Sequence, residues 1–309
     1  MIRYLKHNEI DKALWDATIA IAPQCLSYAY SWYLDVACPH WDALVEDDYQ
    51  AVMPLPHKNK LGITYIFPPY FIQQLGVFSK GDLIAKKVSD FIAAIPDKFK
   101  FIEYYLNIES CAFGEAVFTH KNFDVRKNLT CHLSLKNDYT AITKSYSQKL
   151  KRNLKKALAA ELSIQENVYA KMIVELFRKN RGKEIANLKD ENYQTFLALV
   201  DKANNYNAVK TVGINYKKEL CAGAVFWIQN NKLIFIFSAT NTVAKETGAM
   251  SFLIDRVIQK YAHKADHLDF EGSNNTALAR FYKSFGADEK VYYQIRQNNL
   301  PKPVRWLKK

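Results

Sequence analysis

Three consecutive β-type segments in the second half of the chain constrain its fold more than any other feature. They span residues 209–216, 220–228 and 232–239. Only three polar residues join each neighbouring pair, at 217–219 and 229–231. Because connections this short join antiparallel neighbours, we predict a three-stranded antiparallel meander.

Predicted helices surround this meander. After it, Phe252, Leu253 and Val257 fall on the inner side of a long helix. Before it, Asp190 is the predicted N-cap of another. An order of helices, meander, helix, strand, helix and strand is typical of a compact α+β domain. The segments around the meander are helices 168–179, 190–204, 248–263 and 276–285 and strands 268–270 and 291–296.

The first half of the chain contains the same kinds of segment. A chain of 309 residues is long for one hydrophobic core, and its 49% of apolar residues suffices for two. We therefore predict two α+β domains, residues 1–143 and 144–309. The predicted segments of the first are helices 9–21, 27–36 and 83–95 and strands 41–45, 49–55, 62–67, 101–106 and 131–135.

A basic helix, residues 144–156, opens the second predicted domain. The chain carries a formal charge of +12, which favours an anionic partner such as a phosphorylated cofactor, RNA or an anionic lipid surface. The helix is either a solvated face or a surface that contacts phosphates. Its cations are Lys149, Lys151, Arg152, Lys155 and Lys156.

Residues 275–287, with Asn275, Tyr282 and Gly286 at their spacing, resemble the closing segment of the Gcn5-related N-acetyltransferase fold. The whole chain looks closest to the Fem-type branch, through residues 148–157, 269–273 and 281–286. That resemblance implies two tandem acyl-CoA N-acyltransferase-like domains, each a mixed, mostly antiparallel sheet flanked by helices. Fem-type relatives transfer amino acids from aminoacyl-tRNA onto cell-wall precursors.

The resemblance also implies where an acyl donor binds. The donor would lie along the third strand of the meander, where free backbone N–H groups stabilise an oxyanion. A turn at residues 245–250 would hold phosphate, although Glu246 and Met250 depart from the usual pattern. Gly248 is alternatively an ordinary helix entry, and Asn275 a helix cap. The implied donor-binding residues are Ser238, Ala239, Thr240, Lys245, Gly248, Ala249 and Asn275.

Three side chains are the candidates for proton transfer. Tyr282 would protonate the leaving group, or else it is a core aromatic. Asp269 and Glu271 would take the proton of the amine, and strand alternation predicts both on one sheet face. Their alternative roles are surface carboxylate and helix cap.

Other chemistries lack their sequence signatures. The chain has no Walker loop, nucleophile elbow, HExxH or dinucleotide-binding glycine pattern. Its five cysteines and seven histidines show no metal spacing, so we expect no metal and reduced thiols. With no signal peptide or long apolar run, we expect a cytoplasmic protein. In the first domain, aromatic and amide residues of 65–74 line an acceptor groove or form core.

These observations predict an N-acyl or aminoacyl transferase. Its donor would be acyl-CoA or aminoacyl-tRNA, bound by the second domain, and its acceptor an amine. The first domain would be a degenerate copy on the acceptor side. The alternative is a non-catalytic ligand- or RNA-binding protein that retains the fold.

Overall fold

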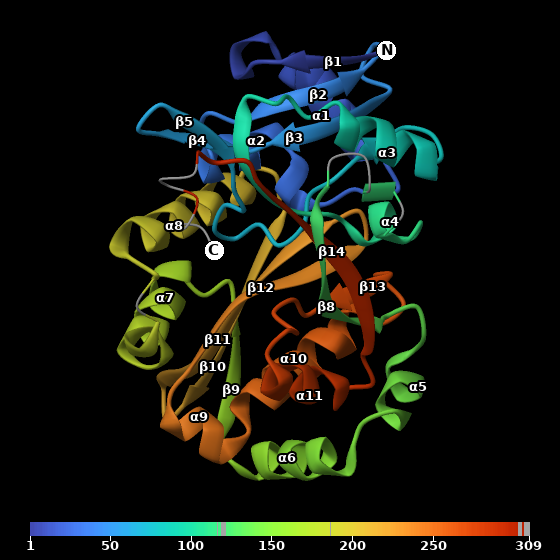
Figure 1. The fold of residues 1–309 in the computed structure, drawn as a ribbon. Coiled ribbons are helices and arrows are strands. Elements are labelled where there is room, and N and C mark those ends of the chain that lie inside the picture. The colour runs from blue at the N-terminus through green and yellow to red at the C-terminus, as the bar shows by residue number, and fades with distance from the viewer. Residues whose placement is uncertain (116, 119–121, 186, 302–304, 306–309) are drawn as a thin grey trace. The chain divides into compact units, whose positions relative to one another are not determined.

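The protein divides into two compact units. A computed structural model describes residues 1–115, 117–118, 122–185, 187–301 and 305. By their internal contacts, residues 1–128 and 291–309 form unit 1, and residues 129–290 form unit 2 (Figure 1). Both units combine helices with mixed sheets, as the sequence predicts. No helix of the described residues is long and apolar enough to cross a bilayer.

This division differs from the predicted junction at residues 143 and 144. Strand β14 (Asp288–Asn298) starts in unit 2 but pairs antiparallel with β7 (Phe99–Tyr105) of unit 1, at residues 294–298. The end of β8 (Asp124–Ser134) pairs instead with β13 (His267–Asp269) of unit 2. Sequence order does not reveal which sheet a strand completes, so composition alone misplaced the boundary.

Unit 1 contains two groups of strands. One has the order β1-β2-β3-β6, and the other the order β4-β5-β7-β14. The predicted strands 41–45 and 49–55 correspond to β2 and β3, which pair antiparallel. Strand β4 was not predicted. The remaining elements are β1 (Ile2–Leu5), α1 (Lys12–Ile21), α2 (Ser31–Ala37), β2 (Asp42–Glu46), β3 (Ala51–Leu55), β4 (His57–Lys60), β5 (Ile63–Ile66), β6 (Phe78–Ser79), α3 (Ala85–Ala93) and α4 (Ile108–Cys111).

Unit 2 is built on the predicted meander. Strands β10 (Val209–Tyr216), β11 (Glu219–Gln229) and β12 (Lys232–Thr240) pair antiparallel in sequence order. The sheet continues on both sides, in the order β8-β13-β12-β11-β10-β9. Edge strand β9 (Leu162–Glu166) was not predicted; it is five residues long, and all but its first residue are exposed.

Helices cover both faces of this sheet (Figure 1). On one face lie α7 (Ala170–Lys179) and α8 (Asp190–Asn204), whose aromatic rings pack against β11 and β12. On the other lie α10 (Ala249–Tyr261) and α11 (Thr276–Lys283), which enclose the main buried core. Lys189, and not the predicted Asp190, occupies the N-cap position of α8.

The predicted basic helix is in fact two helices. Helix α5 (Tyr139–Lys144) ends at Ser145, and Ser147 caps α6 (Gln148–Ala159) by accepting a hydrogen bond from the N–H of Leu150. A serine cap offers the backbone an alternative to a continuous helix. The side chain of Ser145, at the break between the two helices, packs against the backbone of Gly286.

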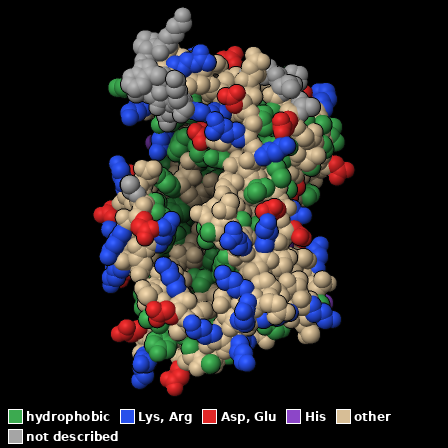
Figure 2. Space-filling model, turned by 60° about the horizontal axis from the view of Figure 1, so that its bottom comes forward, with side chains coloured by type: hydrophobic (Ala, Val, Ile, Leu, Met, Phe, Trp, Pro, Cys, Tyr) green, Lys and Arg blue, Asp and Glu red, His purple; other side chains and the backbone are tan. Residues whose placement is uncertain are grey.

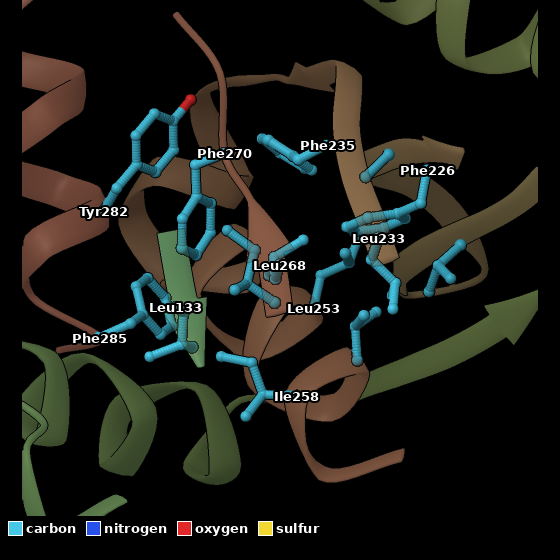
Figure 3. Close-up of a cluster of buried hydrophobic side chains, with 14 of the residues drawn as sticks. Leu133, Phe226, Leu233, Phe235, Leu253, Ile258, Leu268, Phe270, Tyr282 and Phe285 are labelled. Atoms are coloured by element: carbon cyan, nitrogen blue, oxygen red, sulfur yellow. The ribbon is translucent and has the colours of Figure 1, made fainter. Parts of the chain in front are cut away.

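A bulge in β12 reverses the side-chain alternation of that strand. Residue 225 of β11 lies opposite Phe237, but residue 226 lies opposite Phe235, so Ile236 is the extra residue. Phe235 therefore packs with Phe226 and Phe270 on the face of α10 (Figure 3). Phe237 packs with rings of α7 and α8 on the opposite face. One strand thus contributes aromatic rings to both layers.

Candidate active site

The free edge of β12 is the origin of the candidate site. Strand β12 pairs with parallel β13 only from Lys232 to Ile234, because β13 ends at Asp269. Residues 235–240 continue without a strand partner on that side in the described part of unit 2. Backbone groups that point away from β11 therefore remain available along this stretch. These are the strand residues along which the family resemblance implies that a donor lies.

An open cleft of about 810 Å³ runs along this edge. Its walls come from both sides of the sheet, α7 and the turn after it on one, and α9 (Thr242–Thr247), α10 and α11 on the other. Figure 2 shows a hollow with hydrophobic side chains in its walls and Lys and Arg side chains around it. The lining residues are Asn153, Phe177, Asn180, Arg181, Glu184, Ile185, Phe235, Ser238, Ala239, Thr240, Ala244, Lys245, Gly248, Met250, Ser251, Leu278, Phe281 and Tyr282.

Tyr282 presents its hydroxyl to this cleft. Its ring is buried and stacks on Phe270, with 4.6 Å between centroids, and it is edge-on to Phe235. The hydroxyl points away from these rings (Figure 3) and has no hydrogen-bond partner among the described residues. Burial, then the nearby carboxyl of Glu271, raises the pKa of Tyr282, so the phenol keeps its proton and remains a donor.

The two predicted bases lie in different environments. Both carboxylate oxygens of Asp269 have partners. Its Oδ1 accepts hydrogen bonds from the hydroxyl of Thr130 and the N–H of Glu271, and its Oδ2 lies 3.2 Å from Nε2 of His132. Burial alone would raise the pKa of Asp269, but His132 and these donors together lower it.

Glu271 is not on the sheet face that alternation predicts. The strand ends at Asp269, and Glu271 adopts a left-handed conformation with φ of 50°. Its Oε1 atom is buried without a partner, and burial raises the pKa of Glu271 well above its ordinary value. Of the two acids, only Glu271 has a buried oxygen without a hydrogen-bond partner among the described residues, and neither acid lines the cleft.

Of the seven predicted donor-binding residues, five line the cleft, and Ala249 and Asn275 do not. The five are Ser238, Ala239, Thr240, Lys245 and Gly248. The segment from residue 245 is not an open turn, because Lys245 lies in α9, a helix that was not predicted. Lys245 has no carboxylate partner among the described residues, and Glu246 is exposed outside the cleft wall.

Gly248 joins α9 to α10 at a point of close packing. Its φ is 77°, and an added Cβ would lie 2.9 Å from the carbonyl oxygen of Asn153 in α6. The first turn of α10 then offers N–H groups that have no acceptor within the helix. Ala249, the first residue of α10, has a buried side chain, so only its backbone is available to a ligand.

The remaining residues of the resembling segment have structural roles. Asn275 caps α11, since its Oδ1 accepts hydrogen bonds from the N–H groups of Ala277 and Leu278 at 3.0 and 3.1 Å. Gly286 follows α11 with φ of 87°, and a Cβ there would overlap with Oγ of Ser145. The Asn, Tyr and Gly of the segment thus serve as cap, cleft residue and tight turn.

The five predicted cations of α6 form one exposed basic surface. None pairs with a carboxylate among the described residues. The same helix contributes Asn153 to the cleft wall. The basic surface therefore adjoins the cleft through α6. Its members are Lys149, Lys151, Arg152, Lys155 and Lys156.

The aromatic and amide residues of unit 1 do not form a comparable groove. The pocket around Pro68, Gln73 and Tyr105 has a volume of only about 10 Å³. In the described residues, no group of His, Cys, Asp and Glu is arranged to hold a metal ion. All five cysteines are buried, and none forms a disulfide in the described part of the chain.

Sequence reasoning missed one wall of the cleft. Phe177 of α7 and Asn180, Arg181, Glu184 and Ile185 after it line the side opposite Tyr282. Helical periodicity marks Phe177 only as a core candidate, and the residues after it carry no motif. Their shared position became visible only once the meander was folded.

Solved structures share this fold over nearly the whole chain. FemX superposes with a TM-score of 0.72 at 11% identity, covering 99% of both chains. The C-terminal domain of a putative lysylphosphatidylglycerol synthetase from Agrobacterium fabrum gives 0.60 at 8% identity, covering 96% of this chain and 94% of that one. A tandem GNAT protein from the clavulanic acid biosynthesis pathway gives 0.52 at 11% identity, covering 98% and 100%.

These likenesses confirm the predicted tandem GNAT and Fem-like fold. At such low identity they show the fold alone. No protein-family model and no curated protein matches the sequence.

Proposed function

We propose that this protein is an N-acyl or aminoacyl transferase that moves an acyl group from an anionic donor to an amine. The donor is an acyl-CoA or an aminoacyl-tRNA. One observation carries the proposal: a protonated, unpartnered Tyr282 hydroxyl lies in a cleft along the free edge of β12. A proton donor that lies in a cleft and is not held by the protein's own acceptors is available to a substrate.

The residues of the cleft fit the steps of acyl transfer. The amine attacks the acyl carbonyl carbon, and N–H groups of β12 near Ser238 and Thr240 stabilise the oxyanion that forms. The bond from carbon to the sulfur or oxygen of the donor then breaks. Tyr282 donates its proton to that leaving atom. Glu271, which does not line the cleft, takes the proton that the amine loses through an intervening water molecule. No covalent enzyme intermediate is needed.

Positive charge and helix geometry suit an anionic donor. Lys245 and the first turn of α10 lie at one end of the cleft, and a helix N-terminus attracts phosphate through its N–H groups and its dipole. The basic surface of α6 extends this positive region.

Donor binding and transfer test this proposal separately. A ligand that binds only the folded protein raises its melting temperature, so acyl-CoAs and charged tRNAs are compared with CoA and deacylated tRNA. Tyr282→Phe is expected to keep the donor-induced shift and to lose at least about 100-fold in transfer to an amine. If no donor shifts the melting temperature, the transferase proposal is wrong.

A second candidate is a non-catalytic RNA-binding protein, favoured by the exposed cations of α6. Neutralising Lys151, Arg152 and Lys155 together would then weaken RNA binding and flatten its salt dependence, by roughly one unit of slope for each phosphate that is no longer neutralised. Unchanged RNA affinity in this variant would rule this candidate out.

A further inference from the structure

The cleft changes character along β12. Ser238, Thr240 and Lys245 lie at the end of β12 and in the helix after it, together with the first turn of α10. Phe235 lies nearer to β13 and packs with Tyr282 and Phe270. The cleft therefore has one polar, cationic end and one aromatic end.

Apolar side chains in the walls are left open to this space. Leu278 of α11 is 42% exposed and Ile185 is 36% exposed, and both line the cleft. Phe177 and Phe281 are also only partly buried and face the same space. Apolar side chains that stay in contact with water do not stabilise the fold as buried ones do. A ligand that covers them in the cleft would gain this stabilisation.

A small acyl group does not account for such a surface. The cleft volume of about 810 Å³ leaves room for an acyl group larger than acetyl or glycyl beside the anionic part of the donor. An occupant with a bulky apolar group would cover the exposed side chains at the aromatic end. Its anionic part would meet Lys245 and the helix N-terminus at the other end.

We propose that the group transferred is bulky and apolar, a medium-chain acyl or a large aliphatic or aromatic aminoacyl group, held against Phe177, Ile185, Leu278 and Phe281 next to Tyr282. This inference rests on the proposed transferase function. The shared chemistry is an apolar acyl group on an anionic carrier, and the carrier is either CoA or tRNA.

Matched donors test the inference. In one arm, octanoyl-CoA is compared with acetyl-CoA and CoA, and in the other, leucyl-tRNA with glycyl-tRNA and deacylated tRNA. The donor with the larger apolar group is expected to bind at least about tenfold more tightly in the arm of the true carrier, because buried methylene groups each add affinity. The arm that shows this gain identifies the carrier.

A pair of variants assigns the gain to the cleft. Leu278→Asp puts a charge into the apolar wall at the third position of α11, where an acidic residue suits the helix N-terminus. It is expected to abolish the preference for the larger group over the smaller group on the same carrier, a ratio from which any effect of the added charge on the carrier cancels. The control is Met172→Asp, at the third position of α7, 43% exposed and outside the cleft wall.

The outcomes separate this inference from the proposed function. Equal affinity for the small and large acyl groups on a carrier that binds overturns the inference and leaves the transferase proposal standing. A chain-length preference that survives in Leu278→Asp also overturns it. If no charged or acylated donor binds at all, both proposals are wrong.

Discussion

In unit 1 the hydroxyl of Tyr104 donates to the carbonyl of Pro54 at 2.8 Å and accepts the N–H of Gly76 at 3.0 Å. In unit 2 the hydroxyl of Tyr282 has no partner among the described residues. Both rings are buried, and burial raises the pKa of each phenol. The hydroxyl of Tyr104 is thus held by the backbone of its own unit, whereas the hydroxyl of Tyr282 is not held by any described residue.

The surroundings of the two tyrosines differ in the same way. The pocket next to Tyr104 is filled by a proline-rich segment and has about 10 Å³ left, less than a ligand requires. The cleft next to Tyr282 has about 810 Å³. Satisfied polar groups and filled space indicate a structural role for this part of unit 1, and the opposite features indicate the functional role of unit 2.

The largest expected effect comes from removing each hydroxyl. Tyr282→Phe is expected to lower the rate of acyl transfer by about 100-fold or more, since a positioned acid contributes that much. Tyr104→Phe is expected to leave the rate unchanged and to cost about 2 kcal/mol of stability, because the N–H of Gly76 loses its acceptor. Steady-state kinetics and urea unfolding of both variants check this. If both variants lost the same factor in rate, the Tyr282 hydroxyl would have no catalytic role that the Tyr104 hydroxyl lacks.

Two glycines with left-handed backbones allow packing at one site in each unit to be compared. Gly286→Ala in unit 2 is expected to lose about 3 kcal/mol, because strain at φ of 87° adds to a clash with Ser145. Gly62→Ala in unit 1 has φ of 76° but no atom within 4 Å, so only about 1 kcal/mol is expected. Thermal unfolding measures both, and similar losses would mean that Ser145 simply moves aside.

An aspartate paired with a histidine occurs in each unit. Asp42 lies 2.8 Å from His57, and Asp269 lies 3.2 Å from His132. Although burial opposes it, the partners of each carboxyl lower its pKa. A lowered pKa stabilises the fold above about pH 4, and this contribution is lost as pH falls through the folded-state pKa.

Asp42→Asn and Asp269→Asn are therefore each expected to cost about 2 kcal/mol at pH 7. The difference in unfolding free energy between each variant and the parent protein should decrease from pH 7 towards pH 3, as measured by urea unfolding across this range. A gap that is as large at pH 3 as at pH 7 would assign the stabilisation to packing and not to charge.

The smallest expected effect is a gain in stability, where the variants above lose stability. The raised pKa of Glu271 means that its ionisation costs stability as pH rises above the ordinary value for a glutamate. Glu271→Gln is expected to stabilise the protein by about 1 kcal/mol at pH 7 and to slow acyl transfer.

Glu46→Gln of unit 1 is the matched control, because Glu46 pairs with Lys87 at 2.7 Å and should lose a little stability instead. Calorimetry at neutral pH measures both variants. Destabilisation by Glu271→Gln would show that this carboxylate is already satisfied in the folded protein.

Local patterns predicted much of the fold. The meander followed from its two short polar connections, and β10 and α8 have the predicted bounds. Tyr282 and Gly286 were singled out by the spacing of one segment; Tyr282 lines the cleft, and Gly286 forms a tight turn beside Ser145. Periodicity and spacing depend on neighbours in sequence, which is why they succeeded here.

Features that depend on distant parts of the chain were not predictable. The bulge at Ile236 shows only in the register of β11 against β12. Helix α9 is six residues long, too short for a periodic signal, and its capping Asn241 was not recognised. The wall formed by residues 180–185 has no motif, and the partner of β14 is more than 180 residues away in sequence.

The pairing of β14 with β7 has a consequence for how the chain matures. Unit 2 is a continuous stretch, residues 129–290, and all of its strands and helices are synthesised before β14 is complete. Strand β7 of unit 1 pairs with β5 on one side, but its partner on the other side, residues 294–298 of β14, is made only at the end of synthesis. We therefore expect unit 2 to be able to fold before unit 1 is complete, although domains made first generally fold first. The cleft along β12 would then be assembled before unit 1 has received its last strand.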